Sequence, residues 1–176
     1  GYGCINKSQQ EWFSNKSQKY IDRNNQYISG VAFFHIPLYE YLIMGNENLI
    51  NGYRNNTVSC PNGHSDAFKT FQETQNIKAT FCGHDHTNDF AGNYKGIDLV
   101  YGRKTGYGSF GPIGLKGARV IKFKETLDSQ TGLVSVTYKT YIILEDGTLE
   151  DPGINRWQGF EFYQDRCSSV YLIAVY

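Results

Sequence analysis

Three of the four histidines in the chain are placed where they could bind a metal ion together. His84 and His86 stand two positions apart in FCGHDHTNDF, and His35 ends the apolar run VAFFH. Residues i and i+2 of an extended segment point to the same side, which would place both rings of the doublet together. Since sites in α/β sheets gather beyond the carboxyl ends of strands, we expect His35 to join them there. Three neutral imidazoles at one sheet edge would form a divalent metal site.

The polar residues beside the doublet have two interpretations. Asp85, Asn88 and Asp89 could hydrogen-bond the N–H groups of metal-binding imidazoles, as carboxylates and amides commonly do. Alternatively, they are solvated side chains of a surface loop. The first interpretation assigns Asp85 and Asn88 to a supporting layer around the metal ligands.

Two other segments carry groups that could touch a substrate. The glycine-rich run YGRKTGYGSFG contains Arg103, whose guanidinium could bind a phosphate, although a plain turn is the alternative. His64, in PNGHSD, could donate a proton to a leaving group or be an ordinary surface histidine. We assign no residue as catalytic.

The apolar pattern predicts the elements that position these residues. Residues 7–21 are expected to form an amphipathic surface helix, and residues 65–75 a short helix with Ser65 as its N-cap. Residues 44–63, rich in Asn and Gly, predict a long surface loop. Continuous apolar runs predict four buried strands, over residues 31–35, 77–83, 97–102 and 118–123. The alternating run over residues 134–144 predicts a strand with one solvent-exposed face. This order predicts an α/β fold, a sandwich of sheets covered by helices.

Composition limits the function classes. The 176 residues suffice for one ordinary domain, and the 17 basic and 17 acidic side chains give no net charge. A generic nucleic-acid binder needs a basic excess, so nucleic acid is not expected as a partner. No apolar run reaches the roughly 20 residues of a membrane span. Cys82 is expected to be a buried free thiol. Glycosylation sequons at Asn6, Asn15 and Asn55 lean toward the secretory pathway or vacuole, and the compartment is otherwise left open.

Two of these segments together resemble a known family. FFHIPLYEY followed by FCGHDHTNDF resembles the last two metal motifs of the calcineurin-like metallophosphoesterases. FCGHDHTNDF, then YGRKTGYGSFG, then GARVI is similar to the purple acid phosphatase-like branch of that superfamily, and SQQEWF matches the helix after the family's asparagine-histidine motif.

The resemblance implies a site with two metal ions, iron, zinc or manganese, about 3.5–4 Å apart. His35 and His84 match the ligands of one metal, and His86 matches a ligand of the other. The family's remaining ligands come from three upstream motifs, none of which occurs before His35. The resemblance therefore implies that residues 1–157 are the C-terminal half of the catalytic domain, part of a β-sandwich flanked by helices. The missing N-terminal half is then the expected partner, and residues 158–176 do not resemble the family.

Three functions follow as hypotheses. The first is metal-dependent hydrolysis of phosphate esters by a dinuclear site to which this chain supplies the histidine ligands. The second is a catalytically inactive fragment or family member that acts as a structural or binding module. The third is a mononuclear zinc hydrolase that uses His35, His84 and His86 with water, as in other three-histidine sites.

Overall fold

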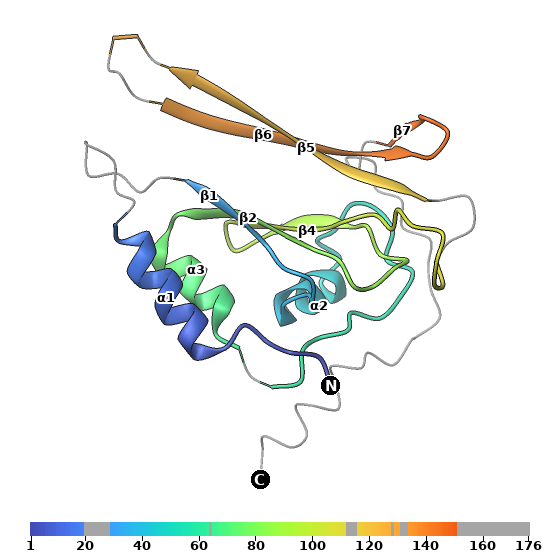
Figure 1. The fold of residues 1–176 in the computed structure, drawn as a ribbon, viewed down its shortest axis with the longest axis horizontal. Coiled ribbons are helices and arrows are strands. Elements are labelled where there is room, and N and C mark those ends of the chain that lie inside the picture. Colours follow the sequence, from blue (N-terminus) through green and yellow to red (C-terminus); the bar gives the residue numbers. More distant parts are fainter. Residues whose placement is uncertain (20–28, 64, 112–115, 128, 131–133, 151–176) are drawn as a thin grey trace.

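The computed structural model describes residues 1–19, 29–63, 65–111, 116–127, 129–130 and 134–150. Helices and strands alternate at first and strands dominate the end of the chain, as Figure 1 shows. The described elements are α1 (Lys7–Ser17), β1 (Gly30–Phe33), α2 (Tyr39–Asn46), α3 (Ala67–Thr74), β2 (Ile77–Cys82), β3 (Ala91–Tyr94), β4 (Ile97–Tyr101), β5 (Gly117–Leu127), β6 (Val134–Leu144) and β7 (Leu149–Glu150).

The first sheet is mixed and has the strand order β1-β2-β4-β3. β1 and β4 both pair with β2 in parallel, whereas β3 returns antiparallel to β4. Because β1, β2 and β4 are parallel, their carboxyl ends lie at one edge of the sheet. The second sheet is antiparallel, with the order β5-β6-β7, and consists largely of the long β5–β6 hairpin.

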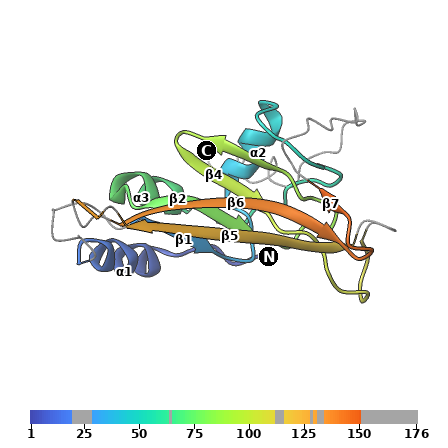
Figure 2. The ribbon, with the colours of Figure 1, turned by 90° about the horizontal axis from the view of Figure 1, so that it is seen from above.

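The described elements form three layers. Figure 1 shows the second sheet above the first and the helices α1, α2 and α3 below it, and Figure 2 shows the hairpin crossing the first sheet. The helices therefore cover one face of the first sheet and the second sheet covers the other, which gives a mixed α/β architecture. Two sheets with helices beside them agree with the predicted fold class at this coarse level.

The larger part of the core lies between the helices and the first sheet. Tyr41 and Met44 of α2 are fully buried there, and Phe71 of α3 meets Phe13 of α1 edge to face, with ring centroids 5.2 Å apart. Each fully buried large apolar side chain contributes about 1.5–3 kcal/mol. A smaller cluster between the two sheets consists of Ala79, Phe81 and Val100, with Val31, Ala91, Ile121 and Tyr138 packed against it.

Capping at the helix starts differs from one helix to the next. At α1, the Asn6 side chain accepts from the Gln9 backbone N–H at 3.0 Å, and the Gln9 side chain accepts from the Asn6 N–H at 2.9 Å. This reciprocal pair fixes the start of the helix. At α3 the predicted N-cap is wrong, because Asp66 is the cap residue and its side chain makes no capping bond. The Ser65 hydroxyl instead accepts from the Ala67 N–H at 3.3 Å.

The predicted helix over residues 7–21 is confirmed up to Ser17, and residues 20–21 lie outside the described residues. Trp12 and Phe13 do not share a buried face. Trp12 is 62% exposed, whereas Phe13 packs against α3. One side chain is exposed and the other packed because the two residues are adjacent in sequence and therefore about 100° apart around the helix.

The strands over residues 77–83, 97–102 and 134–144 are confirmed as β2, β4 and β6. The strand predicted over residues 31–35 exists, but it is not buried, because β1 is an edge strand and Phe33 is 63% exposed. β5 is longer than predicted, and its residues from Lys122 onward are exposed.

The sequence interpretation missed three elements, α2, β3 and β7, which are short and lack a clear apolar period. Residues 44–63 are not a free surface loop. Their first three residues belong to α2, and the rest pairs through the bridges Asn51↔Ala91 and Arg54↔Asn88. None of the described helices is both long and apolar enough to cross a membrane.

Candidate metal centre

Strand pairing brings His35 beside the loop that holds His84. Phe33 of β1 is the register partner of Phe81 of β2, and the chain leaves the sheet in both strands soon after this pair. The Phe34 N–H donates to the Phe81 carbonyl, and the Gly83 N–H donates to the His35 carbonyl, both at 3.1 Å. The parallel register thus carries His35 to the position beside Gly83.

The His35 and His84 rings meet through their nitrogen atoms. His35 Nε2 lies 3.2 Å from His84 Nδ1, and the ring centroids are 5.1 Å apart and nearly perpendicular. Two nitrogen ligands at about 2.0–2.1 Å from one metal ion, separated by about 90–110°, lie about 2.9–3.4 Å apart. The observed separation is that of a hydrogen bond between the two ring nitrogens, and it also matches two neighbouring ligand positions on a single ion.

His84 has an unusual backbone conformation. Its φ of 73° lies in the left-handed region, which residues other than glycine seldom adopt. Such a conformation costs of order 1–3 kcal/mol and persists only where neighbours hold it. The Tyr2 ring is one such neighbour, edge-on to the His84 ring with centroids 4.2 Å apart. Strain at a candidate ligand supports a functional rather than an incidental placement.

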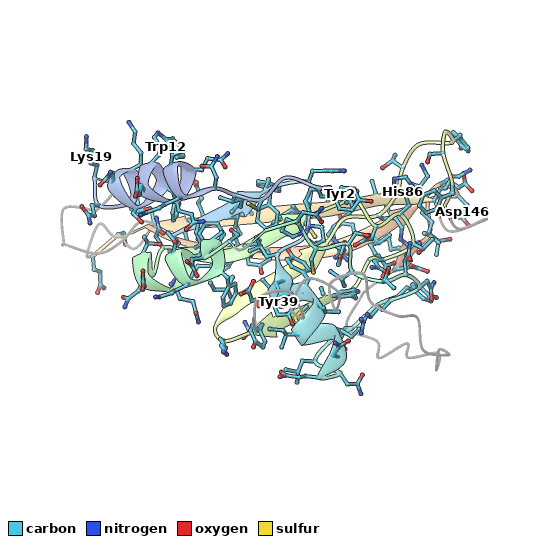
Figure 3. The ribbon with its side chains drawn as sticks, turned by 90° about the horizontal axis from the view of Figure 1, so that it is seen from below. Tyr2, Trp12, Lys19, Tyr39, His86 and Asp146 are labelled. Carbon is cyan, nitrogen blue, oxygen red and sulfur yellow. The ribbon has the colours of Figure 1, made fainter. Side chains whose placement is uncertain are left out.

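His86 lies in a different environment. Its Nδ1 is 2.8 Å from the carbonyl oxygen of Phe110, and its ring lies 4.6 Å from the Phe110 ring. Since a carbonyl can only accept, Nδ1 is the donor of this bond and Nε2 is the ring nitrogen that remains to face a metal ion, the arrangement common for metal-binding histidines. Figure 3 shows His86 and Tyr2 toward the same end of the molecule, away from Trp12 of α1.

The described part of the chain contains no group of three or more His, Cys, Asp or Glu side chains that could hold one metal ion. The structure therefore brings together two of the three predicted histidines, His35 and His84. His86 lies two residues after His84 in the loop between β2 and β3 and contacts the glycine-rich run instead.

Asp85 is neither solvated nor bonded to a histidine. It is 5% exposed, and its Oδ2 accepts from the Tyr101 hydroxyl at 2.7 Å and from the Ser59 N–H at 3.0 Å. These bonds attach the loop between β2 and β3 to the end of β4 and to residues 47–63. Asp85 supports the candidate ligands through the backbone of this loop.

Asn88 and Asp89 make further attachments of the same kind. The Asn88 Oδ1 accepts from the Asn56 N–H at 2.9 Å, and the Asp89 Oδ1 accepts from the Tyr53 N–H at 2.6 Å. Both residues are at most 2% exposed, so the solvated alternative does not hold for them. In FCGHDHTNDF the two histidines are therefore partly exposed, whereas Asp85, Asn88 and Asp89 are buried and anchor the loop.

Arg103 is buried and paired with carboxylates. Its Nη2 donates to Asp89 Oδ2 and, at 2.7 Å, to Glu150 Oε2, and its side chain is only 3% exposed. The structure shows the Arg103 guanidinium paired with carboxylates of the protein itself. A phosphate role for Arg103 stays a prediction. His64 lies outside the described residues.

Sequence reasoning missed Glu150 and Arg119 at this site. Arg119 of β5 donates to the backbone carbonyls of Asp89 and Tyr101, and so ties the second sheet to the loop. Arg119 belongs to the GARVI run quoted for the family resemblance, but nothing in that run or around Glu150 indicates a contact with the loop, because both residues come from the second sheet and reach the loop only through the tertiary fold.

Burial changes the acidity of the groups beneath the loop. It raises the pKa of the Tyr101 phenol well above the ordinary value, and the neighbouring Cys82 and Asp85 add to the rise. Burial also raises the pKa of the Cys82 thiol, which is free as predicted. Burial raises the pKa of Asp89 too, while Arg103 and the Tyr53 N–H oppose that rise. At neutral pH the phenol and the thiol are therefore protonated.

Comparison with known proteins shows that the chain is a distant homologue of the purple acid phosphatase-like proteins over partial regions. It is 37% identical over 129 residues to "Probable inactive purple acid phosphatase 29" of Arabidopsis thaliana, an alignment covering 69% of this chain and 33% of that protein. It is 38% identical over 125 residues to "Probable inactive purple acid phosphatase 28" of the same plant, covering 70% of this chain and 31% of that protein.

A yeast phosphatase is also related. The chain is 34% identical over 98 residues to "Phosphatase DCR2" of Saccharomyces cerevisiae, covering 51% of this chain and 16% of that protein. The chain thus spans about a third or less of the length of these three relatives. No family model matches the chain, and no solved structure matches it either.

Proposed function

We propose that this chain supplies histidine ligands to a metal centre that hydrolyses phosphate esters. The approach of His35 Nε2 and His84 Nδ1 to 3.2 Å carries the proposal, because it fits two ligands of one ion. The relation to purple acid phosphatase-like proteins gives the reaction class. The metals would be two ions drawn from iron, zinc and manganese.

Bound metal ions would neutralise charge on the phosphoryl oxygens and lower the pKa of a coordinated water. The residues of this chain would hold the ions without repelling the substrate, because neutral imidazoles add no negative charge. His35 and His84 would share one ion. His86, with its Nδ1 proton directed to the Phe110 carbonyl, would offer Nε2 to the second.

Three histidines cannot complete two coordination shells, so we propose that the remaining ligands come from a further part of the same protein. An apolar surface supports this partner. Phe33 of β1 and Phe123, Leu127 and Val136 of the β5–β6 hairpin are 45–64% exposed. By their register, these hairpin residues share the face that carries Tyr138, which packs toward the first sheet. An apolar face of this kind is typical of a surface that another segment covers.

The direct test is hydrolysis of an aryl phosphate by a form of the protein that contains this chain together with the regions its longer relatives have. Replacing His84 by Ala should lower metal content and turnover together, because the ion loses a ligand and charge neutralisation in the transition state weakens. Turnover that is unchanged in that variant would refute the proposal.

A non-catalytic role is the second candidate, and the relatives favour it, since two of them are named probable inactive purple acid phosphatases. On this alternative the chain keeps the fold and the histidine pair but does not turn over substrate. Metal binding without measurable hydrolysis in the longer form would identify it. A mononuclear three-histidine site predicts instead one ion bound with equal dependence on His35, His84 and His86.

A further inference from the structure

We propose that Glu150 is a positioning residue for the candidate metal centre, acting through Arg103 and Asp89. We call Asp89, Arg103 and Glu150 the Arg103 cluster. Its members come from three places: the loop after β2, the segment after β4, and β7 of the second sheet. The inference rests on the proposed function, because the geometry that it concerns is that of the metal-binding histidines.

The Arg103 cluster is a charged network inside the protein. The Arg103 and Asp89 side chains are each 3% exposed and the Glu150 side chain 12%. A single nitrogen, Arg103 Nη2, donates to both carboxylates. Glu150 holds this guanidinium in place from β7, so an amide at position 150 removes one of the two charged groups that fix Arg103 beside Asp89, while also removing the repulsion between the two carboxylates.

Asp89 is the point at which the cluster reaches the histidine loop. The Asp89 Oδ1 accepts from the Tyr53 N–H at 2.6 Å, and its N–H donates to the Tyr53 carbonyl at 2.9 Å. Arg119 donates to its backbone carbonyl. Asp89 therefore fixes the end of the loop, three residues beyond His86, as Asp85 fixes its middle.

The loop in turn holds His84 in a strained conformation. A φ of 73° persists only where the surrounding structure holds it, and the two anchors Asp85 and Asp89 follow His84 along the chain, so we assign that support to them. If Asp89 is released, the loop can relax and His84 can turn away from His35. The second sheet, through Glu150, then sets the spacing of the two ligand nitrogens.

The experiment compares Glu150→Gln with Glu125→Gln in the 176-residue chain. Both variants remove one charge with little change of shape, but Glu125 is exposed on β5. Tyr138→Phe is a second control, because it removes the hydroxyl that donates to Asp98 between the sheets and leaves the loop untouched. Amide hydrogen exchange, and the proximity of the His35 and His84 rings by NMR, are first measured on the metal-free chain. The affinity of each variant for Zn²⁺ is measured afterwards.

Glu150→Gln should accelerate exchange of the Asn88 and Asp89 amides at least about tenfold, weaken the contact between the histidine rings, and lower Zn²⁺ affinity about ten- to hundredfold. Neither control should do so. If Glu150→Gln does not fold, Arg103→Lys should give the same changes, since a lysine ammonium cannot reproduce the guanidinium geometry.

Two results would overturn the inference: an unchanged contact between the histidine rings in a folded Glu150→Gln variant, or changes no larger than in Tyr138→Phe. The ring contact is measured without metal, so it tests the inference even if the chain does not bind Zn²⁺. Absence of Zn²⁺ binding by the parent chain would count against the proposed function and leave the test of positioning intact.

Discussion

His35 Nε2 and His84 Nδ1 lie 3.2 Å apart, although 49 positions separate the two residues along the chain. The parallel pairing of β1 with β2 produces this contact, because the Phe33–Phe81 register places both histidines just beyond the same sheet edge. Their rings come from two different strand ends, so the pair reports on the tertiary fold as well as on the site.

The first prediction separates His84 from His86. Replacing His84 by Ala should reduce the affinity of the chain for its first Zn²⁺ ion by at least about tenfold, because a direct ligand is lost. Replacing His86 by Ala should change that affinity by less than about twofold, since His86 contacts Phe110 and not the pair. Calorimetric titration measures both. Equal losses in the two variants would instead support a shared three-histidine ion.

The second prediction concerns close packing at Gly92 of β3. A Cβ added there would lie 2.0 Å from the Leu49 carbonyl oxygen and 2.8 Å from the Met44 sulfur. Gly92→Ala should therefore destabilise the protein by about 1–3 kcal/mol or more, because backbone must move. Gly106→Ala is the matched control, since nothing lies within 4 Å of its added Cβ. Denaturant unfolding compares them, and a loss in Gly92→Ala no larger than in the control would disprove the contact.

The third prediction concerns the exposed apolar face of β1 and the hairpin. Replacing Phe33 and Leu127 by Thr should raise the solubility of the chain and lower its binding of a hydrophobic dye, because both side chains are more than 60% exposed. Trp12→Thr is the control, as Trp12 is 62% exposed on α1 and lies outside this face. If the control lowers dye binding as much as the double variant does, the apolar face of β1 and the hairpin is not the main surface that binds the dye.

Fold and site were predictable to different degrees, for physical reasons. β2 and β4 could be predicted because strands that are buried on both faces consist of continuous runs of apolar residues. His35 and His84 were expected to meet because each follows such a run. The exposure of β1 could not be predicted, since an edge strand and a central strand can have the same continuous run of apolar residues. The roles of Asp85 and Arg103 also escaped prediction, because their partners come from distant segments.

The fourth prediction concerns alkaline pH. Burial raises the pKa of Tyr101, so the folded protein holds this proton more tightly than the unfolded chain does. The corresponding stability is fully present below about pH 10, the ordinary pKa of tyrosine, and is lost as the pH rises through the folded value. Tyr101→Phe should make the fall in unfolding free energy above pH 10 shallower. It should also cost about 1–3 kcal/mol at neutral pH, since Asp85 loses a donor.

Unfolding of both proteins across pH 7–11 supplies the check on Tyr101. Identical pH profiles for the parent chain and Tyr101→Phe would mean that this phenol titrates alike in the folded and unfolded states.

The most direct test of the central claim, that His35 and His84 bind the same metal ion, is nitrogen-resolved NMR of the histidine rings during a Zn²⁺ titration of the chain. We predict that His35 Nε2 and His84 Nδ1 move to metal-bound shifts in step and saturate at one equivalent, while His86 keeps its proton on Nδ1. A response of only one of the two rings, or saturation of the two at different Zn²⁺ concentrations, would contradict the account.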